Sequence, residues 1–199
     1  MYLCKKKEIM CIGLQVNKEL IGNLIVLIEK RCKPLYQTKL LKLLYLIDEE
    51  STIKTGTPVT WLTYKAWQFG PVAEDVYYSK NPGQNNFSKY VIFEHVRGNS
   101  YIVRPIIEFD DAEFSQTDLT IVNDVIDKYG RLSIKKLVSI THTTGSLWNK
   151  TIKHSGIRFS QNNKTSDANI DFGWLVENDG FKKTIFYATM ENIELQAAL

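Results

Sequence analysis

Residue types that could carry out catalysis are sparse in this chain of 199 residues, and they do not form a recognisable set. A cysteine nucleophile needs a histidine base, and Cys32 and His142 could be paired in these roles, but neither lies in a local motif that supports it. The acidic pairs Glu49-Glu50 and Asp110-Asp111 are adjacent in sequence, so in regular structure their side chains point in different directions and are typical of solvated charges. The sequence therefore predicts that the protein is not an enzyme.

Sites for a metal ion or a phosphate-bearing cofactor are not indicated either. His95 has no cysteine, aspartate or second histidine at ligand spacing, which is typical of a surface or half-buried strand residue. Gly70-Pro71 and Gly98-Asn99 are single turn signals without the spacing of a P-loop or a dinucleotide fingerprint. We therefore expect no cofactor and no metal.

The strongest element in the sequence is an apolar helix that begins at Gln37 and reaches Asp48. Its apolar residues form a stripe so wide that only a narrow edge can face water, and they are Leu40, Leu41, Leu43, Leu44, Tyr45, Leu46 and Ile47. A turn at residues 56–58 and an aromatic stretch follow. Gly70 is expected to end that stretch, and Pro71 to open a second helix that runs to Lys80.

Capping residues and periodicity predict the remaining elements. Asn17, Ser115, Ser133 and Thr189 are the expected caps of helices over residues 17–31, 115–130, 133–142 and 189–198. Residues 88–104 read as a hairpin around a turn at 97–100. Residues 153–171 are rich in polar side chains and are typical of a mobile or irregular surface segment.

These elements predict an α+β fold that is mainly α, a compact helical domain with a small antiparallel hairpin or sheet. Residues 1–16 are interpreted as an N-terminal extension, and residues 17–199 as a single domain with a partly irregular C-terminal segment. The expected core includes Leu40, Leu43, Leu44, Ile47, Trp67 and Trp148.

Three blocks of residues, in a fixed order, carry a resemblance to a known family. The first block holds Thr38, Lys39, Leu40, Lys42, Leu43, Leu44 and Tyr45, the second Ala66, Trp67, Gly70, Pro71, Val72, Val76 and Tyr77, and the third Leu132, Ser133, Thr141, His142, Gly145 and Trp148. This combination resembles the Panacea domain of bacterial and phage-associated antitoxins. Most of the block residues are expected to be structural, and His142 is expected to hold the turn to Trp148.

The resemblance implies a function through protein contact. It implies an antitoxin of a type II toxin–antitoxin system that covers the active site of a cognate toxin, for which enzymes that block translation through tRNA or nucleotide chemistry are examples. A rarer mode in the family is an adaptor that delivers the toxin to a Clp-type protease. A homo-oligomer and a heterotetramer with the toxin both stay open. The candidate toxin contacts are Tyr2, Leu3, Tyr77, Tyr78 and Lys80.

Composition limits the other classes of function. The net charge of +3 and the isoelectric point near 8.6 are mild for a nucleic-acid module, so a DNA-binding regulator is kept only as an alternative. The basic residues considered for it are Lys5, Lys6, Lys7, Lys30, Arg31, Lys33, Lys39 and Lys42. No apolar run approaches a membrane span, and three cysteines, Cys4, Cys11 and Cys32, fit a reduced cytoplasmic location.

Overall fold

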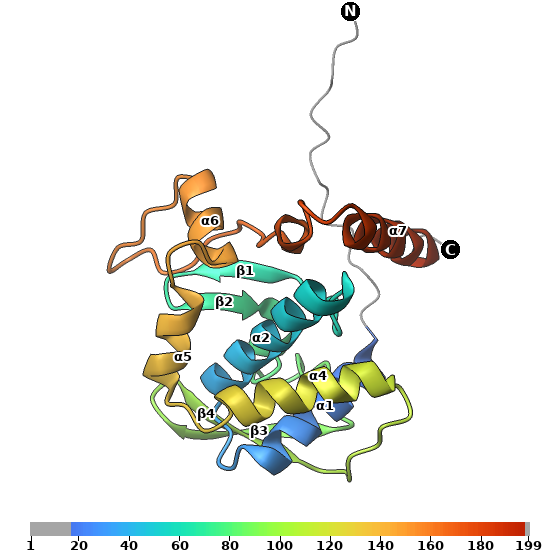
Figure 1. Ribbon diagram of the computed structural model, residues 1–199. Coiled ribbons are helices and arrows are strands. Elements are labelled where there is room, and N and C mark those ends of the chain that lie inside the picture. Colours follow the sequence, from blue (N-terminus) through green and yellow to red (C-terminus); the bar gives the residue numbers. More distant parts are fainter. Residues whose placement is uncertain (1–16, 198–199) are drawn as a thin grey trace, which may run out of the picture.

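The computed structural model describes residues 17–197, and within this range seven α-helices and two small antiparallel sheets of two strands each make up the fold (Figure 1). The predicted class, α+β and mainly α, is confirmed. The buried apolar side chains form one cluster to which all the larger elements contribute. The predicted extension at residues 1–16, including Tyr2 and Leu3, lies outside the described residues.

Helix α2 (Gln37–Thr55) runs through the centre of the molecule and contacts elements on several sides, as predicted for so wide an apolar stripe (Figure 1). Leu40, Leu43 and Ile47 have no exposed surface. The helix continues beyond the predicted end at Asp48, and Gly56, in a left-handed conformation at φ 93°, ends it. Helix α1 (Lys18–Arg31) precedes it and begins at the predicted cap, because the Asn17 side chain accepts hydrogen bonds from two backbone N–H groups.

A short hairpin and a short helix follow α2. Strands β1 (Tyr64–Trp67) and β2 (Gly70–Ala73) pair antiparallel, and α3 (Glu74–Tyr78) comes directly after β2. The prediction that Pro71 opens a helix is therefore wrong, because Pro71 lies inside β2. The proline is tolerated there since β2 pairs only with β1 and its outer edge needs no backbone N–H.

The second sheet is the predicted hairpin. Strands β3 (Val91–Arg97) and β4 (Ser100–Pro105) are joined at the predicted turn, and β4 also forms a bridge to the α1–α2 connector through Ile102 and Tyr36. His95 is exposed on β3, and its Nε2 lies 2.7 Å from the carbonyl oxygen of Gly98. The interpretation of His95 as a surface strand residue is confirmed.

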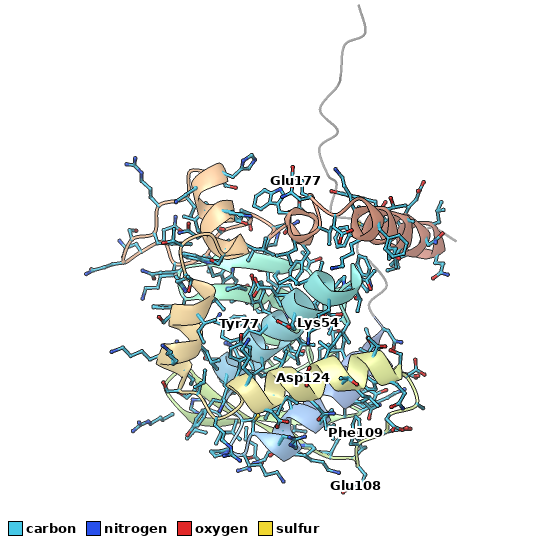
Figure 2. All side chains as sticks on the ribbon, viewed as in Figure 1. Lys54, Tyr77, Glu108, Phe109, Asp124 and Glu177 are labelled. Atoms are coloured by element: carbon cyan, nitrogen blue, oxygen red, sulfur yellow. The ribbon has the colours of Figure 1, made fainter. Side chains whose placement is uncertain are left out.

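Of the next three helices, the first two pack against α2 and the third packs against β1. Helix α4 (Gln116–Tyr129) begins in a capping box made by Ser115 and Asp118, and an ion pair of 3.1 Å between Lys54 and Asp124 joins it to α2 (Figure 2). Helix α5 (Ile134–Thr141) begins at the predicted cap Ser133. Helix α6 (Leu147–His154) follows after a short turn.

The C-terminal part departs most from the prediction. The 3-10 helix η1 (Phe172–Leu175) leads to α7 (Gly180–Ala197), which begins nine residues before the predicted cap at Thr189. The cap is Asp179 instead, whose carboxylate accepts a hydrogen bond from the backbone N–H of Lys182 at 3.1 Å. The segment predicted as irregular, residues 153–171, begins with the last two residues of α6 and is irregular after them, and its end is fixed along β1 by backbone hydrogen bonds such as Ala66 N–H to Ala168 O at 2.9 Å.

A buried carboxylate holds the connector between α2 and β1. Asp48 of α2 accepts hydrogen bonds from the backbone N–H and hydroxyl of Thr60 and from the hydroxyl of Tyr64, the last at 2.7 Å. Burial raises the pKa of Asp48 to about 6, while these hydrogen bonds act in the opposite direction. Within this connector Trp61 has a left-handed φ of 54°, and β1 begins at Tyr64.

None of the helices in the described part of the chain combines the length and the apolar character that crossing a bilayer requires.

Candidate functional site

The three blocks of the family pattern meet at the ammonium group of Lys42. This side chain is 1% exposed, and its Nζ donates a hydrogen bond of 2.7 Å to the carbonyl oxygen of Pro71. Among the described residues no carboxylate forms an ion pair with it. Burial lowers the pKa of Lys42 to about 7. The bond ties β2 to the N-terminal third of α2.

Gly70 lies where the three segments approach one another most closely. It has a φ of 97°, and a Cβ atom there would lie 2.8 Å from Thr141 Oγ1 and 3.1 Å from Lys42 Nζ. A side chain at this position would be strained by its backbone and would also collide with these groups. We call Lys42, Gly70, Pro71, Thr141 and His142 the Lys42 cluster.

His142 and Trp148 fix the end of α5 to the β1–β2 hairpin. The His142 Nε2 lies 3.1 Å from the carbonyl oxygen of Gln68, and its ring centroid is 3.8 Å from that of Trp148. Trp148 is 8% exposed and donates from Nε1 to the carbonyl oxygen of Trp67 at 2.8 Å. The predicted role of His142 at the turn to Trp148 agrees with these contacts.

Next to the Lys42 cluster lies a row of half-exposed rings, which we call the α3 surface; its residues are Trp67, Tyr77, Tyr78, Lys80 and Tyr101. The Trp67 and Tyr77 rings are 4.9 Å apart, and the Tyr77 and Tyr78 rings 5.2 Å apart, both edge to face. The Nζ of Lys80 lies 3.6 Å from the Tyr77 ring centroid, and 5.4 Å from that of Tyr101.

The α3 surface corrects one prediction. Trp67 is half-buried rather than buried, because one side of its ring packs against Tyr77, which is itself partly exposed. Trp148, by contrast, is buried as predicted. Tyr101, on β4, was not expected to belong with α3, since 21 residues separate it from Lys80 in the sequence.

The backbone of α3 is held in place by side chains from its surroundings. Gln37, a buried residue at the start of α2, donates to the carbonyl oxygen of Tyr77 at 2.8 Å. The Ser79 hydroxyl donates to the carbonyl oxygen of Asp75 at 2.6 Å. These bonds satisfy carbonyl groups that a helix of five residues leaves free. The α3 surface is therefore presented on a fixed backbone.

The structure does not bring together the residues considered for catalysis. Cys32 is buried at the end of α1 beside Gly130, and burial raises the pKa of its thiol, which disfavours the reactive thiolate. His142 lies instead between α5 and the β1–β2 hairpin. Within residues 17–197, no group of three or more His, Cys, Asp or Glu side chains could hold a metal ion.

Four of the eight basic residues considered for a nucleic-acid site are paired or buried, and three others, Lys5, Lys6 and Lys7, lie outside the described residues. Lys30 pairs with Glu108, Arg31 with Asp127 at 2.5 Å, and Lys33 lies 3.6 Å from the carboxylate of the buried Glu29. Lys42 is buried. This part of the surface is therefore not a free basic patch.

Comparison with known proteins identifies the family. The family described as antitoxin SocA-like, Panacea domain, matches residues 40–149, more than half of the chain. The chain belongs to this Panacea-domain family. Antitoxin SocA of Caulobacter vibrioides (strain NA1000 / CB15N) is 28% identical over 117 residues. That match spans 58% of this chain and 58% of the relative, less than two thirds of its length. No solved structure matches the chain.

The family match encloses the Lys42 cluster and the α3 surface, and it ends directly after Trp148. Helices α1 and α7 lie wholly outside it. The matched region therefore includes the second and third blocks and all of the first block except Thr38 and Lys39.

The first prediction concerns the pH dependence that Lys42 gives to stability. Its pKa is about 7 in the folded protein and near 10.5 in the unfolded chain, so the unfolded chain binds more protons between these values. Stability should therefore rise with pH across this window. Relative to Lys42→Met, we expect the wild type to gain roughly 3 kcal/mol between about pH 7 and about pH 9.5. Urea unfolding at each pH measures this, and parallel profiles of the two proteins would contradict it.

The second prediction concerns Gly70, with Gly145 as a matched control. Both have left-handed φ angles, 97° and 88°, but nothing lies within 4 Å of a Cβ placed on Gly145. Both alanine variants should lose about 1–2 kcal/mol through backbone strain. Gly70→Ala should lose about 1–3 kcal/mol more, because its Cβ meets Thr141 and Lys42. Equal losses in urea unfolding would show that the Lys42 cluster tolerates the methyl group.

Proposed function

We propose that this protein is the antitoxin of a type II toxin–antitoxin system and neutralises one cognate toxin by binding it with the α3 surface. The observation that carries the proposal is the packed row of Trp67, Tyr77 and Tyr78 rings beside Lys80, half-exposed on a fixed backbone. Membership of the SocA-like antitoxin family supports a toxin as the partner.

The α3 surface has the chemistry that specific protein interfaces use. Tryptophan and tyrosine are enriched among residues that dominate binding energy, because they bury a large area at a low cost in side-chain entropy. The ring contacts already restrict Tyr77 before a partner arrives, which lowers that cost further. A specific complex of ordinary size buries about 1,600 Å² in total, so residues around the α3 surface would contribute as well.

In this proposal the antitoxin covers the active site or substrate path of the toxin and has no catalytic activity of its own. The toxin class that fits the family is an enzyme that blocks translation through tRNA or nucleotide chemistry. The protein acts in the cytoplasm, where a free thiol such as Cys32 stays reduced. We assign residues 17–199 to one domain and residues 1–16 to an extension, in which Tyr2 and Leu3 remain candidate contacts.

The direct test is co-expression with the product of the neighbouring gene. Expression of that product alone should arrest growth, and co-expression with this protein should restore growth in a host with or without Clp-type proteases. Growth arrest that persists in the presence of this protein would refute the antitoxin assignment. Rescue only in hosts that contain the protease would favour the adaptor mode over neutralisation by binding.

The third prediction compares two tyrosines of equal exposure. Tyr78 on α3 is 42% exposed and Tyr187 on α7 is 43% exposed. Tyr78→Ala should weaken toxin binding by about 30-fold or more, the effect of losing an interface hot spot of about 2 kcal/mol. Tyr187→Ala should change the affinity by less than about threefold, since surface residues outside an interface contribute little.

Isothermal titration calorimetry with the purified toxin measures both affinities, and urea unfolding shows whether either variant loses stability. Equal affinities of Tyr78→Ala and the wild type would remove the α3 surface from the interface.

A further inference from the structure

Charge is distributed very unevenly along the chain. Residues 128–166 contain eight lysines and arginines and no aspartate or glutamate, although the whole chain has nearly balanced charges, 25 basic and 22 acidic. The rest of the chain therefore carries more acidic than basic residues. Residues 128–166 are therefore strongly basic although the net charge of the whole chain is only +3.

The structure gathers this segment along one edge of the molecule. Helices α5 and α6 and the loop that follows α6 lie next to one another there (Figure 1). These elements and the connector that precedes α5 carry seven exposed basic side chains, which we call the basic edge: Arg131, Lys135, Lys136, Lys150, Lys153, Arg158 and Lys164. None of the seven forms an ion pair within the described residues, unlike Lys30, Arg31 and Lys33 on α1 and after it.

The helix periodicity explains why these cations all face water. Leu137 and Thr141 form the buried side of α5, which leaves Lys135 and Lys136 on the outer side. In α6 the buried residues are Leu147, Trp148 and Thr151, which leaves Lys150 and Lys153 outside. The packing that builds the Lys42 cluster therefore also fixes the outward direction of these lysines.

Aromatic rings border the basic edge. Phe69, at the turn between β1 and β2, is 60% exposed, and the backbone N–H of its neighbour Gln68 donates to the carbonyl oxygen of Lys164 at 2.9 Å. The exposed His154 on α6 packs edge to face on Trp174 at 5.7 Å. Exposed rings among unpaired cations form the combination that proteins use for single-stranded nucleic acids, in which phosphates meet the cations and bases stack on the rings.

We propose that the basic edge binds the phosphate backbone of a single-stranded nucleic acid, with Phe69 as a stacking platform for a base. An acidic protein surface is the competing occupant, but lysine is depleted in protein–protein interfaces, and five of the seven cations are lysines. Phosphate contacts, by contrast, are made chiefly by lysine and arginine. This proposal does not depend on the proposed function, because the α3 surface shares no residue with the basic edge.

The test is fluorescence anisotropy with a labelled single-stranded RNA, a single-stranded DNA of the same sequence and the corresponding DNA duplex. Binding of the full chain to a single strand should weaken steeply between about 50 and about 200 mM salt, because each phosphate contact contributes about 0.7 to the logarithmic salt slope. Lys150→Glu/Lys153→Glu should reduce that slope by about 1.4 and weaken binding by at least about tenfold at low salt.

A matched charge control keeps the test specific. Lys89→Glu/Lys183→Glu makes the same change of charge at two exposed lysines away from the basic edge, and it should leave affinity within about threefold of wild type. Phe69→Ala should weaken single-strand binding by about fivefold or more while leaving the salt slope unchanged. The RNA and DNA arms decide which of the two single strands is preferred.

Several outcomes would overturn the proposal. They are no binding of either single strand, tighter binding of the duplex, or equal losses in the edge variant and the charge control. If the wild type binds no nucleic acid and Lys150→Glu/Lys153→Glu loses toxin binding, the basic edge binds an acidic protein partner instead. Failure of the proposed antitoxin function would instead appear as growth arrest that persists in the co-expression test, and it would leave these measurements unchanged.

Discussion

The ammonium group of Lys42 is buried inside the molecule, and the interaction that compensates it is a hydrogen bond to the carbonyl oxygen of Pro71. Burying a charge without a counter-ion costs free energy, and the lowered pKa of about 7 is the sign of that cost. The bond joins the N-terminal third of the central helix to the second strand of the β1–β2 hairpin. Gly70 and Thr141 can come this close only because one has no side chain and the other a small one.

The α3 surface depends on this arrangement. The hairpin fixed by Lys42 carries Trp67, whose carbonyl oxygen accepts from Trp148 and whose ring packs against Tyr77. The same central helix provides Gln37, which holds the carbonyl oxygen of Tyr77. Family residues that are distant in sequence thus act together as the support of one exposed surface. Most family residues can therefore have a structural role, because they hold in place the exposed residues that we propose bind the toxin.

The helix starts and the hairpin turn that a few neighbouring residues specify could be predicted from the sequence. The caps Asn17, Ser115 and Ser133 and the hairpin turn at residues 97–100 were identified correctly, because each is specified by a few neighbouring residues. Pro71 was predicted to open a helix but lies in β2. A proline is acceptable there because β2 is an edge strand that pairs with β1 alone, and this pairing is not apparent from the local sequence. The start of α7 was missed because Asp179 was not considered as a cap.

The candidate site was less accessible to prediction. A lysine on a helix normally faces water, so nothing local indicates that Lys42 is buried, and only tertiary packing explains it. Trp67 was expected in the core because of its size, yet its neighbours leave part of its ring exposed. By contrast, the sequence shows directly that residues 128–166 contain no acidic residue. The net charge of the whole chain does not reveal this, because the acidic residues elsewhere balance the basic segment.

The central claim is that the Lys42 cluster supports a toxin-binding surface on α3. Hydrogen–deuterium exchange of this protein, free and bound to the neighbouring gene's product, tests it most directly. We expect the toxin to slow exchange in residues 74–80 and in the facing part of β4, and to leave the amides of α4 and α7 unchanged. Slower exchange confined to α4 or α7, with residues 74–80 unaffected, would contradict it.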